Sequence, residues 1–298
     1  DYASVLMMCS VRLSSFAWAL ADNPELRKSA TLSDFLGYLF FMPAFFVGPA
    51  FPFSTYLKWT KELPPYNSIP SPAIPALKAL FLGAFCTFLY MRFDDDWSYT
   101  HLLDPAFLAR TTLLQRILFV QAAGLLMRTK YYGVWKIGEF TCILSGIGYS
   151  GADTWKACEN VDIPALETSQ TPNATLQNWN IFINNHLHAN VYKRLRGAGL
   201  GASAANYLTK GTSAVWHGFF PGYYLTFASA AVMSMCAQMV RNEVRPLFAT
   251  ASAPFGFKPM YDFVSWMCAQ FIMNYICGPF TVYWLGPGIA VWRAVGYA

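Results

Sequence analysis

Residues 72–93 read PAIPALKALFLGAFCTFLYMRF, and this stretch decides the fold class. It contains only two charged residues, Lys78 and Arg92. A helix needs about 20 predominantly apolar residues to cross the hydrocarbon core of a bilayer. The stretch therefore predicts a membrane-spanning helix.

Similar apolar segments recur on both sides of this stretch. Polar connections between them are short, the main ones being 58–71, 93–105 and 151–178. The other segments long enough to span or re-enter a membrane lie at 3–21, 33–51, 106–127, 131–150, 203–220, 221–240 and 261–285. This order predicts an all-α, multi-pass membrane protein, a helical bundle forming a single domain over 1–298.

The composition agrees with a membrane protein. The chain has 298 residues, of which 55% are hydrophobic and only 12% charged, well outside the range of ordinary soluble domains. The net charge of +5 comes from clusters between apolar runs, as in Arg128-Thr129-Lys130 and Lys193-Arg194-Leu195-Arg196. Such clusters predict anchors at the membrane face, and no soluble basic module for nucleic acid can be identified.

Several segments contain residues that are costly next to lipid. Pro43, Gly48 and Pro49 interrupt the segment 33–51, which predicts a broken or re-entrant helix whose freed backbone groups need protein partners. Charges inside other apolar segments are expected to face a polar passage within the protein rather than lipid. These charged residues are Arg12, Lys78, Arg110, Arg116, Lys136, Glu139 and Lys210.

Two further features concern the chain's extent and its cysteines. The sequence opens at Asp1 without a methionine and runs directly into an apolar stretch, so we expect a fragment of a longer protein. Seven scattered cysteines without a Cys-x-x-Cys pair predict reduced packing residues. His186 and His188 would point in different directions on a helix, so no metal site is predicted.

The segment from Asn178 to Arg196 differs from the apolar ones. Its apolar residues recur every three or four positions, which predicts an amphipathic helix lying along a membrane face or on the protein core. Asn180, Asn184 and His188 follow one another at four-residue spacing and form a polar stripe on this helix. A solvated face is an equally good interpretation for Asn184 and His188.

His217 stands in the apolar run Ala214-Val215-Trp216-His217-Gly218-Phe219-Phe220. Taken alone, it is a packed core histidine satisfied by a backbone carbonyl, or a neutral imidazole placed to accept a proton. The sequence contains no Gly-x-Ser-x-Gly elbow and no cysteine suited to pair with this histidine. A base without a protein nucleophile favours direct transfer to an acceptor hydroxyl, with a second polar group nearby.

Local motifs over most of the chain resemble the membrane-bound O-acyltransferases, and among them the lysophospholipid acyltransferase branch. The C-terminal part of the resemblance rests on Trp179-Asn180, Val191-Tyr192-Lys193-Arg194, Ser213-Ala214-Val215-Trp216-His217-Gly218 and Pro221-Gly222-Tyr223-Tyr224. Upstream it rests on Phe35-Leu36-Gly37-Tyr38, Gly146-Ile147-Gly148-Tyr149-Ser150-Gly151 and Trp155 through Asn160-Val161-Asp162-Ile163.

The resemblance implies a tunnelled, multi-pass enzyme of the endoplasmic reticulum whose two signature residues map onto Asn180 and His217. It implies acyl-CoA as co-substrate, a lysophospholipid from the bilayer as acceptor, and no cofactor. His217 would remove the proton from the lysophospholipid hydroxyl as that oxygen attacks the thioester. Asn180 would either orient the hydroxyl or hydrogen-bond the thioester oxygen, and both roles remain open.

Four further residues are candidates for substrate binding. Trp179 and Trp216 would line the acyl or headgroup pocket, although aromatic packing beside a polar site explains them equally. Glu139 occupies a position where the family pattern also carries an acidic residue, and a buried ion pair with Lys136 is the alternative. Asn184 completes the set as part of the polar stripe.

Two competing functions complete the hypotheses. A member of the same family acting on a sterol, a diacylglycerol or a protein would use the same histidine and asparagine. A membrane transporter would instead line a solute path with Arg12, Lys78, Glu139 and Lys210, and His217 would relay protons.

Overall fold

The computed structural model describes residues 2–249 and 257–297, and every named element in these ranges is a helix. Within them, one isolated bridge pairs Gly151 with Thr154. The chain forms two compact units, each of which is described by itself. The prediction of an all-α fold is confirmed.

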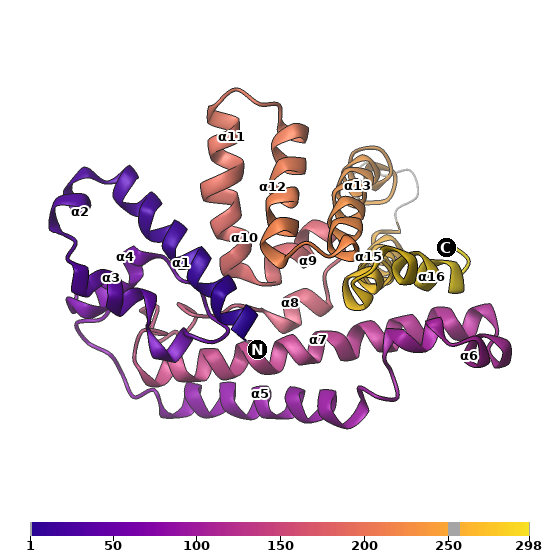
Figure 1. Ribbon diagram of the computed structural model, residues 1–298, viewed down its shortest axis with the longest axis horizontal. Coiled ribbons are helices and arrows are strands. Elements are labelled where there is room, and N and C mark those ends of the chain that lie inside the picture. Colours follow the sequence, from indigo (N-terminus) through magenta and orange to yellow (C-terminus); the bar gives the residue numbers. More distant parts are fainter. Residues whose placement is uncertain (1, 250–256, 298) are drawn as a thin grey trace. The chain divides into compact units, whose positions relative to one another are not determined.

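Unit 1 comprises residues up to 89 together with 130–162 and 179–194. It contains long helices or parts of them, together with several short helices and turns (Figure 1). Its elements are α1 (Tyr2–Asp22), α2 (Pro24–Ser29), α3 (Leu32–Leu39), a 3-10 turn (Met42–Ala44), α4 (Phe53–Thr60), most of α5 (Ala73–Phe93), the second half of α7 (Leu113–Leu144), α10 (Ile181–Leu187), a π-helical turn (His188–Tyr192) and the start of α11 (Lys193–Gly197).

Unit 2 comprises residues 90–129, 163–178 and those from 195 onward. Its core includes Tyr99, Leu102, Phe119 and Val291, all buried. Its elements are a 3-10 turn (Tyr99–Leu103), α6 (Pro105–Arg110), the first half of α7, α8 (Ile163–Glu167), α9 (Pro172–Asn178), α12 (Ala202–His217), α13 (Pro221–Glu243), α14 (Arg245–Ala249), α15 (Lys258–Val282) and α16 (Leu285–Ala294).

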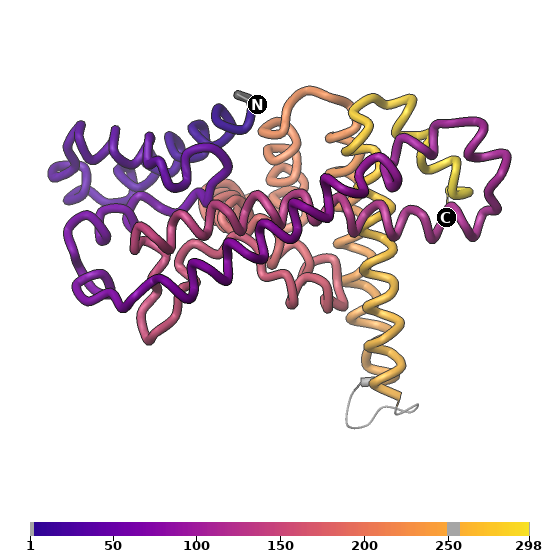
Figure 2. The backbone as a smooth tube through the Cα atoms, turned by 90° about the horizontal axis from the view of Figure 1, so that it is seen from below, coloured from indigo at the N-terminus to yellow at the C-terminus, as the bar shows by residue number. Residues whose placement is uncertain are grey.

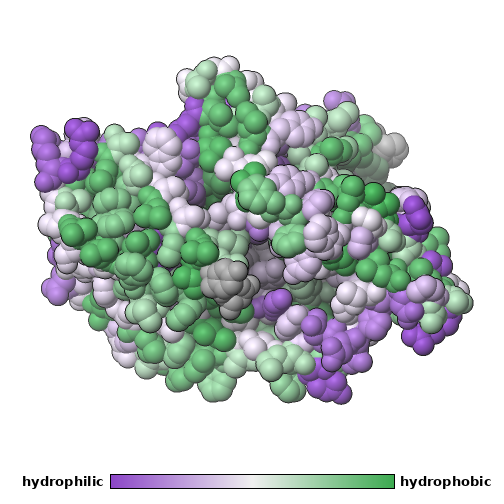
Figure 3. All heavy atoms as spheres, viewed as in Figure 1, coloured by the Kyte–Doolittle hydropathy of each residue, from purple (hydrophilic) through white to green (hydrophobic). Residues whose placement is uncertain are grey.

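Three helices of the described chain are long and apolar enough to cross a membrane: Ala3–Asp22 in α1, Ala73–Phe93 in α5 and Pro221–Glu243 in α13. Apolar side chains cover the visible face of α5 (Figure 3). Its exposed residues include Ile74, Leu77, Phe81, Phe85, Phe88 and Met91. Such a row of large apolar side chains is unfavourable in water and suits contact with lipid.

Glycines allow α5 and the second half of α7 to pack closely. A Cβ atom added to Gly83 would lie 3.1 Å from the carbonyl oxygen of Gly133, and one added to Gly133 would overlap the Thr87 hydroxyl. The two helices run alongside each other (Figures 1 and 2). Small residues at such a crossing bring the backbones into contact, which is a common packing mode of membrane helices.

The predicted break in the segment 33–51 is present. Thr31 and Asp34 form a capping box at the start of α3, and the helix ends at Leu39. A 3-10 turn containing Pro43 follows, and an extended stretch then leads to α4. Proline cannot continue the helical hydrogen-bond ladder, so carbonyl groups at the break lose their helical donors.

Arg12 on α1 supplies hydrogen bonds to these carbonyl groups. Its guanidinium donates to the carbonyl oxygens of Tyr38 at 3.3 Å, Leu39 at 2.9 Å and Ala44 at 2.6 Å. The Arg12 side chain is only 1% exposed, and the Phe51 ring lies 5.9 Å from its guanidinium carbon. Arg12 thus fills the need for a protein partner that the broken segment creates.

Replacing Arg12 with leucine is expected to destabilise the protein by about 3 kcal/mol, because the carbonyls of Tyr38, Leu39 and Ala44 all lose a charged hydrogen-bond donor. Thermal unfolding of the purified protein measures this loss. Arg27→Leu, which removes an exposed arginine from α2, is the matched control. Equal unfolding midpoints for the two variants would contradict the structural role of Arg12.

The structure corrects the boundary between two predicted segments. The apolar runs 106–127 and 131–150 were expected as separate segments, but α7 is one helix over Leu113–Leu144. Arg128-Thr129-Lys130 suggested the boundary, yet arginine and lysine are good helix formers and neither proline nor glycine interrupts this triplet. The run thus continues as a helix through the charges.

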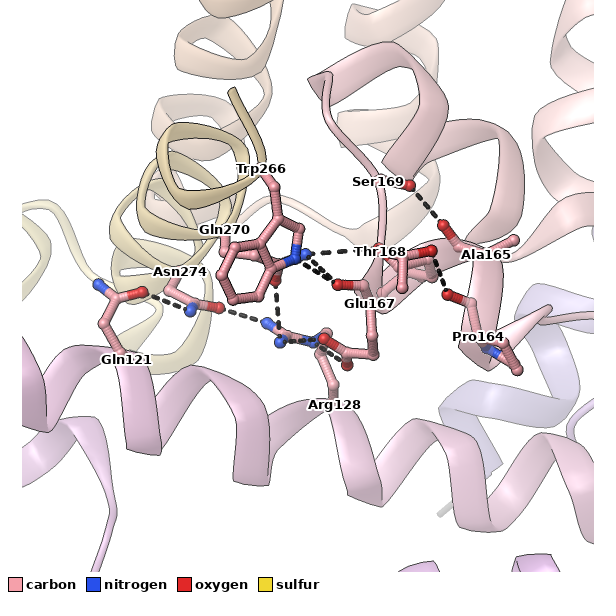
Figure 4. A network of polar contacts seen from close by, with 11 residues as sticks. Gln121, Arg128, Pro164, Ala165, Glu167, Thr168, Ser169, Trp266, Gln270 and Asn274 are labelled. Atoms are coloured by element: carbon pink, nitrogen blue, oxygen red, sulfur yellow. Dashed lines mark hydrogen bonds and ion pairs between the residues drawn. The ribbon is translucent and has the colours of Figure 1, made fainter. Parts of the chain in front are cut away.

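Arg128 lies in a polar network inside unit 2 (Figure 4). Its guanidinium donates to both carboxylate oxygens of Glu167, at 2.9 and 2.8 Å, and to Gln270 at 3.2 Å. It also donates to Asn274, whose amide donates in turn to Gln121 at 2.8 Å. The bidentate ion pair and its amide partners tie α7, α8 and α15 together within the unit. The guanidinium therefore has a structural role, and the prediction of Arg128 as a membrane anchor was incomplete.

Candidate active site

Asn180 lies directly before α10, and its backbone is left-handed, with φ 45° and ψ 54°. Asparagine tolerates this conformation better than most residues, because its short side chain bonds locally. The amphipathic segment was expected to be helical from Asn178, but the helix begins only at Ile181. The expected placement of Asn180 on the helical stripe was therefore wrong.

Asn160, which is 3% exposed, makes three hydrogen bonds to this turn. Its side-chain Nδ2 donates to Asn180 Oδ1 at 3.1 Å, and its Oδ1 accepts from the Phe182 backbone N–H at 3.2 Å. Its backbone oxygen accepts from the Ile181 N–H at 2.9 Å. Two N–H groups in the first turn of α10, which have no helical partners, are satisfied in this way.

Trp179 packs in an aromatic cluster with three residues of α7. Its ring centroid lies 5.3 Å from Tyr131, 6.0 Å from Tyr132 and 4.8 Å from Trp135, each in an edge-to-face arrangement. Contacts of this geometry stabilise packing and fix the residue that precedes Asn180. Aromatic packing accounts for Trp179 in the structure, and a pocket-lining role stays a prediction.

Glu139 belongs to a chain of charges within unit 1. Lys136 Nζ lies 2.8 Å from Glu139 Oε2 and 3.6 Å from Glu159, and both residues of the first pair are less than 10% exposed. Lys156 continues the chain to Glu159 at 3.5 Å and to Asp162 at 3.8 Å. The predicted buried ion pair is thus present, and this chain of charges flanks Asn160 in the sequence.

The amphipathic segment is helical from Ile181 to Gly197, with a π-helical turn in its middle. Asn184 is partly exposed, and among the described residues its side chain makes no hydrogen bond. His188 is exposed and stacks on Tyr192 with a centroid distance of 5.1 Å. His188 fits the solvated-face interpretation, whereas substrate binding by Asn184 stays a prediction.

His186 joins α1 to the amphipathic segment. The Ser14 hydroxyl donates to the Val11 carbonyl, so its oxygen accepts from His186 Nε2 at 3.0 Å. The Asn190 amide donates to His186 Nδ1 at 3.1 Å. Burial lowers the pKa of His186, which favours the neutral imidazole that these hydrogen bonds require. With both ring nitrogens engaged, His186 is a structural residue.

His217 is the last residue of α12, and Gly218 ends the helix with φ 125°. A residue with a Cβ atom is strained at this φ, which explains why glycine follows the histidine. Within the described residues, no side chain or backbone group hydrogen-bonds to either His217 ring nitrogen. The alternative prediction, a core histidine hydrogen-bonded to a backbone carbonyl, is therefore wrong.

Aromatic rings surround the His217 imidazole inside unit 2. Their centroids lie 4.8 Å away for Trp216, 5.7 Å for Tyr223, 5.2 Å for Phe227 and 5.1 Å for Phe280. These rings pack around the imidazole, which stays partly exposed, and the neutral form is favoured in such apolar surroundings. An unpaired neutral imidazole in an apolar enclosure is suited to accept a proton from a substrate hydroxyl.

Gly222 brings α13 and the end of α15 together beside this enclosure. Its backbone N–H donates to the Tyr283 carbonyl at 2.7 Å, and an added Cβ would overlap the carbonyl oxygen of Pro279. Figure 2 shows α13 and α15 side by side. Because Tyr223 and Phe280 are carried by these two helices, the close approach at Gly222 positions two of the rings around His217.

The predicted site residues fall into two groups. Trp179, Asn180, Glu139 and Asn184 belong to unit 1, whereas Trp216 and His217 belong to unit 2. Each group is local and well defined within its own unit. The pairing of Asn180 with His217 and the enclosed tunnel stay predictions.

Comparison with known proteins identifies the family. The family model described as MBOAT, membrane-bound O-acyltransferase family, matches residues 3–278. The chain belongs to this family. The match covers both units and includes Asn160, Asn180 and His217, and it agrees with the three helices suited to span a membrane. The resemblance found in the sequence motifs is confirmed, as is the prediction of an integral membrane protein.

Relatives within the family include two yeast proteins. The "Lysophospholipid acyltransferase" of Schizosaccharomyces pombe is 32% identical over 98% of this chain and 62% of its own length. The "Lysophospholipid acyltransferase" of Saccharomyces cerevisiae is 30% identical over 99% of this chain and 55% of its own length. "Membrane-bound glycerophospholipid O-acyltransferase 1" of Mus musculus is 24% identical over 99% of this chain and 65% of its own length. The chain therefore spans about three fifths of the length of these curated relatives.

Two features beside the predicted site residues were not predicted from sequence. Asn160 was noted only as part of Asn160-Val161-Asp162, because its hydrogen bonds reach residues 20 and 22 positions later. Phe227 and Phe280, which face His217, were not identified because apolar helices contain many phenylalanines. The sequence offers one indication for Asn160, which is an uncharged amide between two acidic residues, Glu159 and Asp162. In the structure both acidic residues pair with lysines.

Proposed function

We propose that this chain carries the site that transfers a fatty acyl group from acyl-CoA to the free hydroxyl of a lysophospholipid. The observation that carries the proposal is His217, an imidazole with unpaired ring nitrogens inside an aromatic enclosure. Family membership supports acyl transfer as the reaction type. The names of the yeast relatives support a lysophospholipid as the acceptor.

In the proposed reaction, a His217 ring nitrogen takes the proton of the lysophospholipid hydroxyl while the hydroxyl oxygen attacks the thioester carbon. The new C–O bond forms as the carbonyl oxygen gains negative charge. The intermediate then collapses, the C–S bond breaks, and CoA leaves as its thiolate, which can take up the proton held by His217. No covalent acyl-enzyme is needed, and the reaction requires no cofactor beyond the co-substrate.

The remaining site residues have supporting roles in this proposal. Asn180 contacts the reacting groups through its amide, and Trp179 and Trp216 line the substrate pocket beside the two signature residues. Asn184, which is partly exposed, contributes polar surface for substrate binding, and Glu139 supports the site through its buried ion pair with Lys136. We place the reaction at the endoplasmic reticulum membrane, where acyl-CoA approaches from the cytosol and the acceptor from the bilayer.

The alternatives differ in their support. A sterol, a diacylglycerol or a protein acceptor would use the same histidine, and the relatives' names favour the lysophospholipid over these. For the transporter, Arg12 and Glu139 would have to line a solute path. Arg12 instead bonds three backbone carbonyls and Glu139 pairs with Lys136, which argues against that function.

The test is acyl transfer by the full chain, purified and reconstituted in lipid nanodiscs. Isotope-labelled acyl-CoA is offered with a panel of lysophospholipids of different headgroups, cholesterol or diacylglycerol, and products are identified by mass spectrometry. We expect label in phospholipid only when a lysophospholipid is present. Label in a steryl ester or triacylglycerol alone would overturn the acceptor, and absence of transfer to every acceptor would overturn the function.

A further inference from the structure

Asn160 is fixed in one orientation by a group that can only donate. The Phe182 backbone N–H must face an oxygen, so the amide oxygen of Asn160 points toward it, at 3.2 Å. The Asn160 Nδ2 group then points toward Asn180, 3.1 Å from its Oδ1. The backbone thus removes the ambiguity that usually accompanies the two ends of an asparagine amide.

The orientation of Asn180 follows from that of Asn160. Because Asn160 presents N–H donors, Asn180 must present its oxygen to them, and its own Nδ2 group points away from Asn160. Among the described residues, no acceptor is bonded to the Asn180 Nδ2. Asn180 is partly exposed, so this amide group is accessible from outside its turn. The side chain therefore has both N–H donors unused, while its oxygen already accepts one hydrogen bond.

This polarity favours one of the two roles of Asn180 that the sequence left open. In the proposed reaction the acceptor hydroxyl gives its only proton to His217, so Asn180 is not needed to accept it. Asn160 also already occupies one of the two acceptor positions of the Asn180 oxygen. An amide that stabilises the thioester oxygen needs a free N–H, which Asn180 has. Donors aimed at an oxygen that gains charge lower the barrier of acyl transfer.

We propose that Asn160 is a positioning residue that holds Asn180 in its left-handed turn and fixes it as a hydrogen-bond donor to the thioester oxygen. The inference rests on the proposed function. As the lysophospholipid hydroxyl oxygen attacks, the thioester oxygen becomes an oxyanion and accepts a hydrogen bond from an N–H of Asn180. When the C–S bond breaks, the oxyanion returns to a carbonyl and the hydrogen bond weakens.

The Asn160 backbone supports the same assignment. Its carbonyl oxygen bonds the Ile181 N–H at 2.9 Å, and this bond does not depend on the side chain. Replacements of the Asn160 side chain consequently leave one link between residues 160 and 181 in place. The side chain can be altered while the turn keeps its backbone support, which makes the proposal testable.

The decisive replacement is Asn160→Asp. A carboxylate still accepts from the Phe182 N–H, but it presents an acceptor to residue 180 and turns the Asn180 amide around, with its oxygen outward. We expect kcat to fall about a hundredfold, with the KM for acyl-CoA and lysophospholipid within about threefold of the parent. Asn160→Ala, which removes both side-chain bonds without adding charge, is the second variant and should also lower kcat.

A double-mutant cycle shows whether Asn160 acts through Asn180. Asn180→Gly removes the amide and tolerates the left-handed backbone. In this background, Asn160→Asp and Asn160→Ala are expected to cause no further loss of kcat. Asn173→Asp, the same chemical change at an exposed position of α9, is the control and should keep the parent's activity. Thermal unfolding of every variant checks that the fold is retained.

The outcomes separate the inference from the proposed function. Losses that multiply in the double variants, or parent-like kcat in Asn160→Asp, would overturn the positioning role while the parent's acyl transfer upholds the function. A fall in unfolding temperature that accounts for the lost activity of both variants would also overturn it. An inactive parent would overturn the proposed function itself.

Discussion

Replacing His217 with alanine is expected to lower the rate of acyl transfer by about a hundred- to ten-thousand-fold, because the reaction loses its general base. The imidazole makes no hydrogen bond to any described residue, so its removal breaks no polar contact that supports the fold. The four surrounding rings lose packing against it, which costs some stability. Initial rates with labelled acyl-CoA, at saturating lysophospholipid, measure the effect.

His188→Ala is the matched control for this replacement. His188 is exposed on the π-helical turn and contacts Tyr192, so its loss should leave kcat within about twofold of the parent. His217→Gln keeps a polar side chain of similar size but has no basic nitrogen, and it should be as inactive as alanine. Parent-like activity of either His217 variant in a folded protein would show that the proton goes elsewhere.

Asn180→Asp is expected to reduce kcat by about a hundred- to a thousandfold, as much as complete removal of the side chain in Asn180→Gly. Aspartate adopts the left-handed backbone and still accepts from Asn160, so the turn should remain intact. It has no N–H to offer to the thioester oxygen. Its negative charge would also oppose the charge that develops there.

The comparison with Asn185→Asp tests whether charge alone explains the loss. Asn185 is exposed on α10, five positions along the chain from Asn180, and its replacement introduces the same charge nearby. We expect near-parent rates for this control. If Asn180→Asp retained substantial kcat while Asn180→Gly did not, Asn180 would act as an acceptor, and the donor role would be wrong.

Helix positions in apolar stretches could be predicted well because a single physical requirement governs them. The segment 72–93 corresponds to α5 over Ala73–Phe93, since an uninterrupted apolar run has no other stable form in a bilayer. The break in 33–51 followed from its prolines in the same way. The continuity of α7 did not follow, because the partner that neutralises Arg128 is Glu167, 39 positions away.

The site was predictable in its residue types but not in its geometry. His217 could be predicted as a site residue because an imidazole in an apolar run is energetically costly next to lipid, and the run is visible in the sequence. The left-handed backbone of Asn180 and the orientation of its amide depend on Asn160, which no local pattern connects to it. Hydrogen bonds between distant residues leave no periodic signal, so the donor role that we propose for Asn180 could be inferred only from the folded chain.

The length of α7 has a consequence for the surrounding lipid. Its 32 residues extend about 48 Å at 1.5 Å per residue, whereas a hydrocarbon core is about 30 Å thick. A straight helix of this length fits within that core only when tilted by more than about 50° from the bilayer normal, and otherwise its ends enter the headgroup layers. The 21 residues of α5 extend about 32 Å and match the core. In a bilayer, α7 therefore has to tilt strongly or extend beyond the hydrocarbon core, and this helix contributes residues to both units.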